Sequence, residues 1–193
     1  DNRGAPRLLI EGRVYQKMTG WGPGRTEGCG DQRPRGEGLS YQHAHEHCYK
    51  YRDIDMDMSG IDCAVWFPTL GLFTSDIQNW DFQYAVMRCL NDWTAKDFAT
   101  GKRHFWCASI PLNPKWAVDE IKRCRKMGAT AVWMRPNVME GVRYWNEDWD
   151  IVWKTMTDLG MSLLFHEATG TNNATYSTDY KYDRYWIAHA MSH

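Results

Sequence analysis

Two polar residues at the end of an apolar run, His166 and Glu167, have side chains that could do chemistry. The run at residues 161–165 (MSLLF) precedes them directly. A neutral imidazole binds zinc, iron and manganese alike, so His166 could be a metal ligand or a catalytic group. It could also be a strand-end histidine that hydrogen-bonds a loop. Glu167 could orient a neighbouring ligand or bind a polar substrate group, or it could be an exposed loop charge.

Arg135 and Asn137 follow the apolar run at residues 129–134 in the same way. A planar guanidinium holds a carboxylate through two parallel hydrogen bonds, so Arg135 could bind a substrate carboxylate. Equally, it could form a salt bridge that closes the end of the strand. Asn137 could supply a hydrogen bond nearby, or it could simply end the strand.

Three alternate histidines, His43, His45 and His47, could also bind a metal. Glycines precede them and no apolar strand surrounds them, so the solvated start of a helix is the favoured interpretation. The sequence has no G-x-G-x-x-G after a strand, no G-x-S-x-G and no phosphate-binding P-loop. The absence of these motifs argues against dinucleotide-binding, α/β-hydrolase and nucleotide-hydrolysing proteins.

The elements that must position these residues alternate along the second part of the chain. Four short apolar runs are each stopped by proline or a polar residue, and amphipathic segments separate them. Continuously apolar strands are buried on both faces, and strands separated by helices form parallel βαβ units. The predicted strands lie at residues 63–67, 105–110, 129–134 and 161–165, and the predicted helices at 76–99, 114–127 and 146–159.

Each predicted helix has one apolar face, with residues three or four positions apart. Gly128 and Gly160 are expected to end the second and third helices, and Pro114 to lie in the first turn of the second. The residues expected to face inward are Phe82, Val86, Cys89, Leu90 and Trp93; Ala117, Ile121 and Cys124; and Trp149, Val152, Trp153 and Met156.

Residues 1–59 have a different character. The segment 7–15 predicts a short hairpin that turns at Glu11-Gly12. Residues 20–38 are rich in glycine, arginine and proline and predict a loop, and residues 43–58 predict a helix that ends at Gly60. We therefore expect a single domain over residues 1–193, in which 1–59 supply the hairpin, the loop and a leading helix and 60–193 supply four βα units.

Two α/β architectures fit this order of elements: an open doubly wound sheet, or part of a (β/α)8 TIM barrel with an irregular N-terminal hairpin excursion. A complete barrel takes about 250 residues, and this chain has 193. Four βα units are visible and the chain ends within a predicted helix, which favours a partial barrel over a complete small domain. In both architectures ligands bind at the carboxyl ends of the strands, where Arg135 and His166 lie.

Composition narrows the class of partner. The net charge of −1 gives no basic surface for nucleic acid or an anionic membrane, and no apolar run approaches the roughly 18 residues of a membrane helix. The six cysteines are at least 15 residues apart, so there is no C-x-x-C motif, and we expect free thiols in a reducing, cytoplasmic compartment. Eleven tryptophans indicate a large aromatic core or a pocket with aromatic walls.

The segment at residues 58–69 (MSGIDCAVWFPT) resembles a strand of the amidohydrolase-2 family, whose pattern is D-x-x-G-I-D-x-x-V-x-x-P-T. This family contains metal-dependent barrels related to aminocarboxymuconate-semialdehyde decarboxylase. Residues 89–93 (CLNDW) resemble the family's A-Y-N-D-W helix. Further segments follow in the family's order: 110–112 (IPL), 128–132 (GATAV), 135–137 (RPN), 165–167 (FHE) and 190–193 (AMSH).

The resemblance implies a metal site that is only partly present in this chain. His166 matches the family's metal-ligand histidine at the end of the fifth barrel strand. The family's strand-one H-x-H or E-x-H pair, its catalytic histidine after strand six and its metal-binding aspartate after strand eight have no counterpart here. They are expected before residue 1 and after His193, and the chain alone is therefore expected to be inactive.

By the same resemblance the protein would be a hydrolase or a non-oxidative decarboxylase that uses one divalent metal, with zinc expected ahead of manganese or iron. Its substrate would be small, carboxylated and cyclic or unsaturated, and Arg135, Asn137 and Glu167 would bind it. A homo-oligomer is compatible with this interpretation. The alternative is a non-catalytic binding or scaffold domain in which His166 is incidental.

The two interpretations differ in how residues 1–193 behave alone. A partial barrel has two parallel strand edges without partners, so we expect the isolated chain to aggregate or dimerise. A complete scaffold domain would instead be a soluble monomer that unfolds cooperatively. Size-exclusion chromatography and thermal unfolding of the isolated chain distinguish the two.

Overall fold

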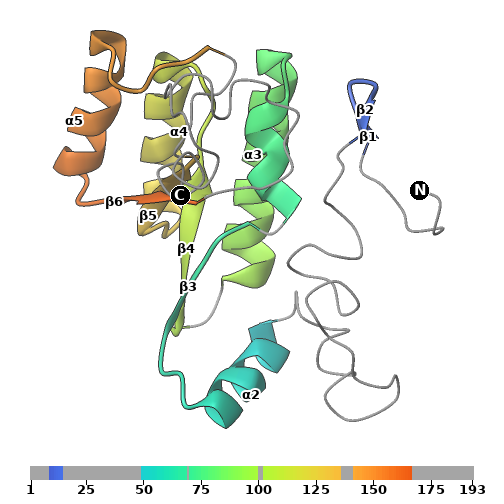
Figure 1. The fold of residues 1–193 in the computed structure, drawn as a ribbon. Helices are drawn as coiled ribbons and strands as arrows, with labels where there is room; N and C mark the ends of the chain where they lie inside the picture. The colour runs from blue at the N-terminus through green and yellow to red at the C-terminus, as the bar shows by residue number, and fades with distance from the viewer. Residues whose placement is uncertain (1–8, 15–48, 69, 100–101, 136–140, 167–193) are drawn as a thin grey trace, which may run out of the picture.

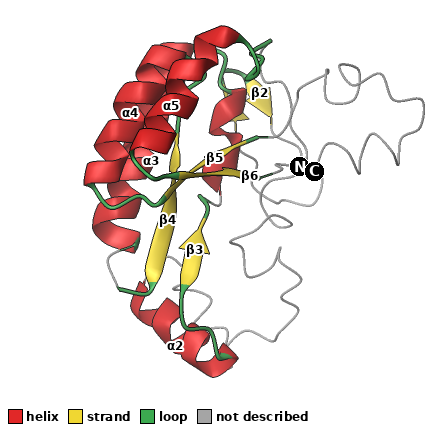
Figure 2. Ribbon diagram, turned by 90° about the vertical axis from the view of Figure 1, so that its left-hand side faces the viewer, coloured by secondary structure: helices red, strands yellow, loops and turns green. Residues whose placement is uncertain are grey.

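The structure, a computed structural model, describes residues 9–14, 49–68, 70–99, 102–135 and 141–166. Its centre is a four-stranded parallel sheet in the order β3-β4-β5-β6. Three α-helices alternate with these strands along the chain and lie side by side on one face of the sheet (Figures 1 and 2). The strands are β3 (Ala64–Trp66), β4 (His104–Ser109), β5 (Ala131–Met134) and β6 (Ser162–Phe165), and the helices are α3 (Trp80–Trp93), α4 (Pro114–Lys126) and α5 (Asp150–Asp158).

The strand order decides between the two architectures. A doubly wound sheet reverses its strand order at a switch point and has helices on both faces. Within the described residues, each strand pairs with the next one along the chain, without a reversal, and α3, α4 and α5 all cover the same face of the sheet. This is the arrangement of a (β/α)8 barrel, and the prediction of a partial barrel is confirmed.

The sheet also curls in the way that a barrel requires. The first and last of its strands, β3 and β6, are three strand spacings apart, which is about 14 Å in a flat sheet. Nevertheless, the ring of Phe67, just after β3, lies 4.8 Å from the ring of His166, just after β6. Side chains from the two outer strands therefore meet across the concave face, at the carboxyl ends of the strands.

Each side of the curled sheet has its own apolar cluster. Between sheet and helices, an outer cluster contains Trp106 and Val132 of the sheet with Ile121 of α4 and Trp149 beside α5, all at most 2% exposed. On the concave side, a smaller inner cluster contains Leu72, Cys107, Ala131 and Trp133, with Ile10, Phe67 and Leu164 packed against it. Trp106, Trp133 and Trp149 are the three bulkiest fully buried side chains of the described segments, which confirms the predicted aromatic core.

The prediction for α4 is confirmed, and the prediction for α5 is confirmed except at its start, where a 3-10 helix, η3 (Glu147–Trp149), precedes the α-helix. Asn113 caps α4, because its Oδ1 accepts hydrogen bonds from the backbone N–H groups of Lys115 and Trp116 at 3.1 and 3.2 Å. Pro114 occupies the first turn, where its missing N–H costs nothing. Gly128 follows the helix with φ +101°, a conformation that suits glycine. Of the residues expected inward, all are buried except Trp153, which is partly buried: Ala117, Ile121, Cys124, Trp149, Val152 and Met156.

The predicted inward face of α3 is wrong at three of its five residues, whereas Val86 and Leu90 are partly buried. Phe82 and Trp93 are 46% and 40% exposed, and Cys89 is exposed as well. The residues buried by α3 are Gln83, Met87 and Asn91. Hydropathy misplaced the face because two of these three side chains are polar and are buried through hydrogen bonds instead of apolar contact.

The start of this helix also differs from the prediction. A buried 3-10 helix, η1 (Leu70–Asp76), follows β3, and α3 begins at Trp80 instead of residue 76. Asn79 caps it, with its Oδ1 accepting from Phe82 N at 3.0 Å. A short π-helical segment, Thr94–Phe98, ends the predicted range.

Burial on both faces holds only for the central strands. Strands β4 and β5 are buried along almost their whole length, whereas β3 and β6 are partly exposed, with Val65 at 49% and Phe165 at 54%. The prediction is wrong for these two because each pairs with one strand only among the described residues. A continuous apolar run therefore indicates how far a strand is buried when it has a neighbouring strand on each side, as in a closed barrel.

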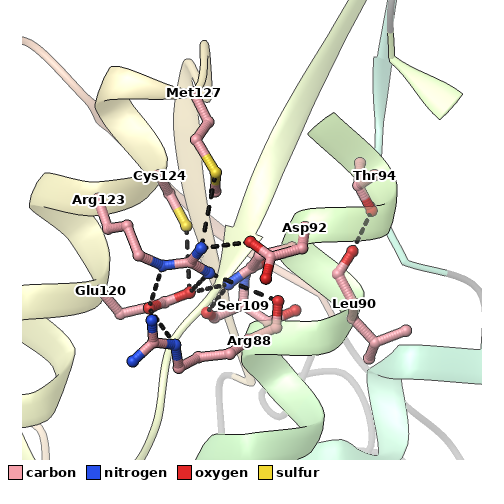
Figure 3. Close-up of polar contacts among 10 residues, drawn as sticks. Arg88, Leu90, Asp92, Thr94, Ser109, Glu120, Arg123, Cys124 and Met127 are labelled. Atoms are coloured by element: carbon pink, nitrogen blue, oxygen red, sulfur yellow. Dashed lines mark hydrogen bonds and ion pairs between the residues drawn. The ribbon is translucent and has the colours of Figure 1, made fainter. Parts of the chain in front are cut away.

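Polar contacts between α3, α4 and β4 join these elements into one unit (Figure 3). Asn91 donates from Nδ2 to the backbone O of Ser109 at 2.9 Å and to Glu120 Oε1 at 2.7 Å. Its Oδ1 accepts from Ser109 N at 2.9 Å. Arg123 donates to both oxygens of the fully buried Glu120 and also pairs with Asp92. The N-D of the CLNDW segment thus fixes α3 to its neighbours.

The predicted hairpin is present: β1 (Leu9–Ile10) and β2 (Arg13–Val14) are antiparallel. Glu11 and Gly12 form its turn, with φ +52° and +74°. The Glu11 carboxylate accepts hydrogen bonds from the backbone N–H groups of Gln78 and Asn79 at 2.8 and 2.9 Å, which anchors the hairpin beside the start of α3.

Helix α2 (Tyr49–Ser59) lies at the amino-terminal ends of the strands (Figure 1). It ends before Gly60, which has φ +70°, as predicted. Arg103 binds Asp57 at 2.7 Å, and His104 Nε2 lies 3.0 Å from Asp53 Oδ1. Residues 43–48 of the predicted helix, the loop at 20–38 and the segment 183–193 lie outside the described residues. Within the described segments, every helix is too short or too polar to cross a membrane.

Candidate active site

The concave face of the sheet at the carboxyl ends of the strands is the candidate site. Side chains alternate between the two faces along a strand. Ala131 and Trp133 of β5 and Leu164 of β6 face the inner cluster. Arg135 and His166 continue that alternation by one step, so they lie on adjacent strands at the same level of the inner face, as the pairing of Met134 with Phe165 indicates.

His166 is held by its backbone and by its ring. Its backbone N–H donates to the carbonyl oxygen of Met134 at 2.9 Å, which extends the pairing of β6 with β5 by one residue. Its ring, partly buried, meets the ring of Phe67 at a centroid distance of 4.8 Å and an angle of 59°. The imidazole is therefore presented at the carboxyl end of the sheet, as a ligand or catalytic group requires.

Arg135 forms an ion pair at the same end of the sheet. Its side chain is fully buried, and its Nη1 donates to Asp76 Oδ1 at 2.9 Å. Asp76 is the last residue of η1, so the pair joins the segment after β3 to the end of β5. This salt bridge is one of the two alternatives that the sequence left open for Arg135; its binding of a substrate carboxylate stays a prediction.

Segment η1 forms part of the wall of the site. Leu72 N donates to Pro68 O at 3.1 Å and turns the chain back, so that the Leu72 side chain enters the inner cluster. Gly71 makes this close turn possible, because a Cβ there would lie 2.7 Å from Pro68 Cβ and 2.9 Å from Leu90 Cδ1. Ile10 of the hairpin packs against the same cluster.

Below these polar residues the interior is apolar and unreactive. Trp133 donates from Nε1 to Ser109 Oγ at 2.9 Å, so both polar groups are satisfied. Burial raises the pKa of the Cys107 thiol to about 12, so this cysteine is protonated at neutral pH and acts as a small apolar side chain.

Several predicted site residues lie outside the described residues: Asn137, Glu167, His43, His45 and His47. Their predicted roles stay predictions. The described part of the chain holds no group of three or more histidine, cysteine, aspartate or glutamate side chains that could hold a metal ion. The role of His166 as a metal ligand likewise stays a prediction.

Sequence reasoning did not identify Asp76 and Phe67 as part of this site. Asp76 was assigned to the start of a helix, and nothing near it in the sequence indicates a partner 59 residues away. Phe67 belongs to the strand end that the sequence placed at the ligand-binding side. That placement was the only signal for it.

A second histidine, His104, lies at the opposite end of the sheet. Trp66 donates from Nε1 to His104 Nδ1 at 2.8 Å, and the other ring nitrogen faces Asp53. His104 begins β4, and residues at the amino-terminal ends of barrel strands serve stability. With both ring nitrogens in hydrogen bonds, it joins α2 to the sheet and is a structural residue.

No protein-family model matches the chain, but several solved structures resemble it. An amidohydrolase from Mycobacterium avium subsp. paratuberculosis superimposes with a TM-score of 0.65 at 18% identity, over 98% of this chain and 57% of that one. A 2,6-dihydroxybenzoate decarboxylase from Rhizobium gives a TM-score of 0.60 at 19% identity, over 81% and 50% of the two chains. The chain thus has the fold of part of a (β/α)8 barrel, the fold of these structures.

A third structure of this kind contains a metal. The 5-carboxyvanillate decarboxylase from Novosphingobium aromaticivorans, solved with bound manganese and 3-methoxy-4-hydroxy-5-nitrobenzoic acid, gives a TM-score of 0.57 at 18% identity, over 81% of this chain and 44% of that one. The chain thus spans about half the length of the amidohydrolase-barrel structures that it matches. At this level of identity the similarity establishes the fold, and the expected partial barrel agrees with it.

Proposed function

We propose that the protein is a metal-dependent hydrolase or non-oxidative decarboxylase whose site lies at the carboxyl end of the described sheet. The observation that carries this proposal is the position of His166, on the inner face directly after β6. Essentially all characterised TIM-barrel enzymes have their active sites at this end. The metal-containing decarboxylase with the same fold supports a divalent metal there.

His166 would hold the metal together with ligands from outside the described residues. The metal, when bound, would polarise a substrate carboxylate or carbonyl or activate a bound water. Zinc is the metal proposed from the sequence, and manganese is an alternative that the decarboxylase structures support. Metal analysis of the purified full-length protein decides between them.

Arg135, Asn137 and Glu167 are proposed to bind the substrate. A small carboxylated ring fits a site with a guanidinium in it, and the decarboxylases with this fold were solved with benzoate derivatives. Because Arg135 is fully buried and paired with Asp76, its proposed contact with a substrate carboxylate would be made from a fixed position. Phe67 and the inner cluster supply the apolar surface beside it.

Replacing His166 with alanine is the direct test. We expect His166→Ala in the full-length protein to lose most of its bound metal and to lower kcat/KM by at least about 100-fold, since changes outside the ligand shell already cost up to 100-fold. Elemental analysis and an activity screen with carboxylated aromatic substrates measure the two effects. Circular dichroism must show an unchanged fold.

Two results would contradict the proposal. If His166→Ala keeps full metal content and full activity, His166 is not a ligand. If the wild-type full-length protein has neither bound metal nor turnover, the binding or scaffold alternative replaces the enzyme.

A further inference from the structure

We propose that Phe67 is a positioning residue that fixes the orientation of the His166 imidazole for metal binding. This inference rests on the proposed function of His166. Phe67 extends from the opposite edge of the described sheet, and its ring reaches the imidazole across the concave face at a centroid distance of 4.8 Å. The contact tilts the two rings by 59°, a geometry that aromatic pairs favour.

Phe67 is itself held firmly. It packs against the inner cluster of Leu72, Cys107, Ala131 and Trp133. The next residue, Pro68, is packed against Gly71 and accepts a hydrogen bond from Leu72 N. The ring of Phe67 is thus a rigid surface for His166.

The backbone hydrogen bond of His166 does not by itself orient its ring. The hydrogen bond from its N–H to Met134 fixes where the residue lies along β5. A metal ligand needs its donor nitrogen aimed correctly, and neighbours that restrict the ring supply that aim. Phe67 restricts the imidazole from the concave side.

The test compares two phenylalanines near the same histidine in the full-length protein. Phe67→Leu removes the ring and keeps an apolar side chain in the inner cluster. Phe165→Leu is the matched control, because Phe165 precedes His166 directly but its side chain lies on the other face of β6, away from the imidazole. Phe67→Tyr keeps the ring and should restore wild-type behaviour.

Two measurements are needed, and neither depends on enzyme activity. One measures metal binding and the other uses the metal-free protein. The first is the dissociation constant for Mn²⁺, which we expect to rise about three- to tenfold in Phe67→Leu. This fold-change corresponds to the loss of the interaction free energy of one aromatic pair. The second is NMR of the histidine side chains in the metal-free protein. Removing the ring of Phe67 should move the His166 ring resonances, identified with His166→Ala, whereas Phe165→Leu should change the Mn²⁺ affinity by less than about twofold.

The outcomes separate the two proposals. A wild-type protein that binds neither Zn²⁺ nor Mn²⁺ overturns the proposed function. If the wild type binds Mn²⁺ and His166→Ala does not, but Phe67→Leu binds as tightly as the wild type with unmoved His166 resonances, the positioning role alone is overturned. Equal losses in Phe67→Leu and Phe165→Leu would also overturn it, because the effect would then not depend on the ring contact.

Discussion

Replacing Asp76 with asparagine is expected to lower the free energy of unfolding of the full-length protein by about 3–5 kcal/mol. The ion pair between Asp76 and Arg135 is buried on both sides, with side-chain exposures of 5% and 0% and a separation of 2.9 Å. Removing the negative charge breaks this buried pair and leaves the guanidinium in the interior without the Asp76 charge. Urea unfolding of the wild type and the variant measures the loss.

The exposed ion pair between Lys154 and Asp158 is the matched control. It has a similar separation, 2.9 Å, but its side chains are 74% and 59% exposed. Asp158→Asn is therefore expected to change the unfolding free energy by no more than about 0.5 kcal/mol. If Asp76→Asn were equally mild, the Asp76 charge would contribute little to stability, and the buried pair would not hold η1 against the sheet.

A double variant tests whether Asp76 and Arg135 stabilise the protein through their interaction with each other. Arg135→Met together with Asp76→Asn removes both charges from the interior, and replacing both members of a buried pair costs much less than breaking it. We therefore expect the double variant to be more stable than the sum of the single losses predicts. A strictly additive loss would show that each residue acts through other contacts.

The parts of the fold that apolar periodicity and helix caps specify were predictable from the sequence. The inward residues of α4 and α5 were predicted correctly because their own side chains are apolar and are buried by apolar contact. Asn113, Gly128 and Gly160 mark the helix boundaries. The glycine-containing turn at Glu11-Gly12 identified the hairpin in the same way.

Helix α3 shows where this reasoning stops. Its buried face depends on Gln83, which accepts from Leu112 N at 3.0 Å and donates to Ile77 O at 2.9 Å, and on Asn91, which pairs with the backbone of Ser109. These amides satisfy backbone groups at the end of β4 and after it. Hydropathy counts a polar side chain as exposed, so it cannot anticipate burial that depends on partners distant in sequence.

The candidate site divides in the same way. The position of His166 follows from a local pattern, an apolar strand with a histidine directly after it. The residues that contact His166 and Arg135 do not follow from a local pattern. Phe67 and Asp76 come from the segment after β3 and reach the site only when the sheet curls. Their roles depend on tertiary geometry.

Stability at acid pH is expected to depend on Glu120, which lies at the centre of the contacts between α3 and α4 (Figure 3). Burial by itself raises the pKa of the Glu120 carboxyl, but hydrogen bonds from Arg123 and Asn91 outweigh it and leave the pKa below its ordinary value of 4.5. The unfolded state therefore binds more protons than the folded state as the pH falls below neutrality. The stability that Glu120 contributes is fully present above pH 4.5 and is lost as the pH falls through the folded-state pKa.

Glu120→Gln should remove this dependence. Glutamine keeps the shape and part of the hydrogen bonding but not the charge, so we expect a loss of about 1–3 kcal/mol at pH 7. The difference from the wild type should shrink as the pH falls below 4.5, because the wild-type carboxyl then becomes neutral as well.

Urea unfolding of both proteins from pH 7 to pH 3 tests this expectation, with Asp119→Asn as the control. Asp119 precedes Glu120 on α4 but is exposed, so its variant should follow the wild-type curve. A constant difference between Glu120→Gln and the wild type across this range would show that the loss comes from hydrogen bonds that glutamine does not make, and not from the carboxylate charge. A difference that shrinks on acidification assigns the stabilisation to the carboxylate charge, held between Arg123 and Asn91.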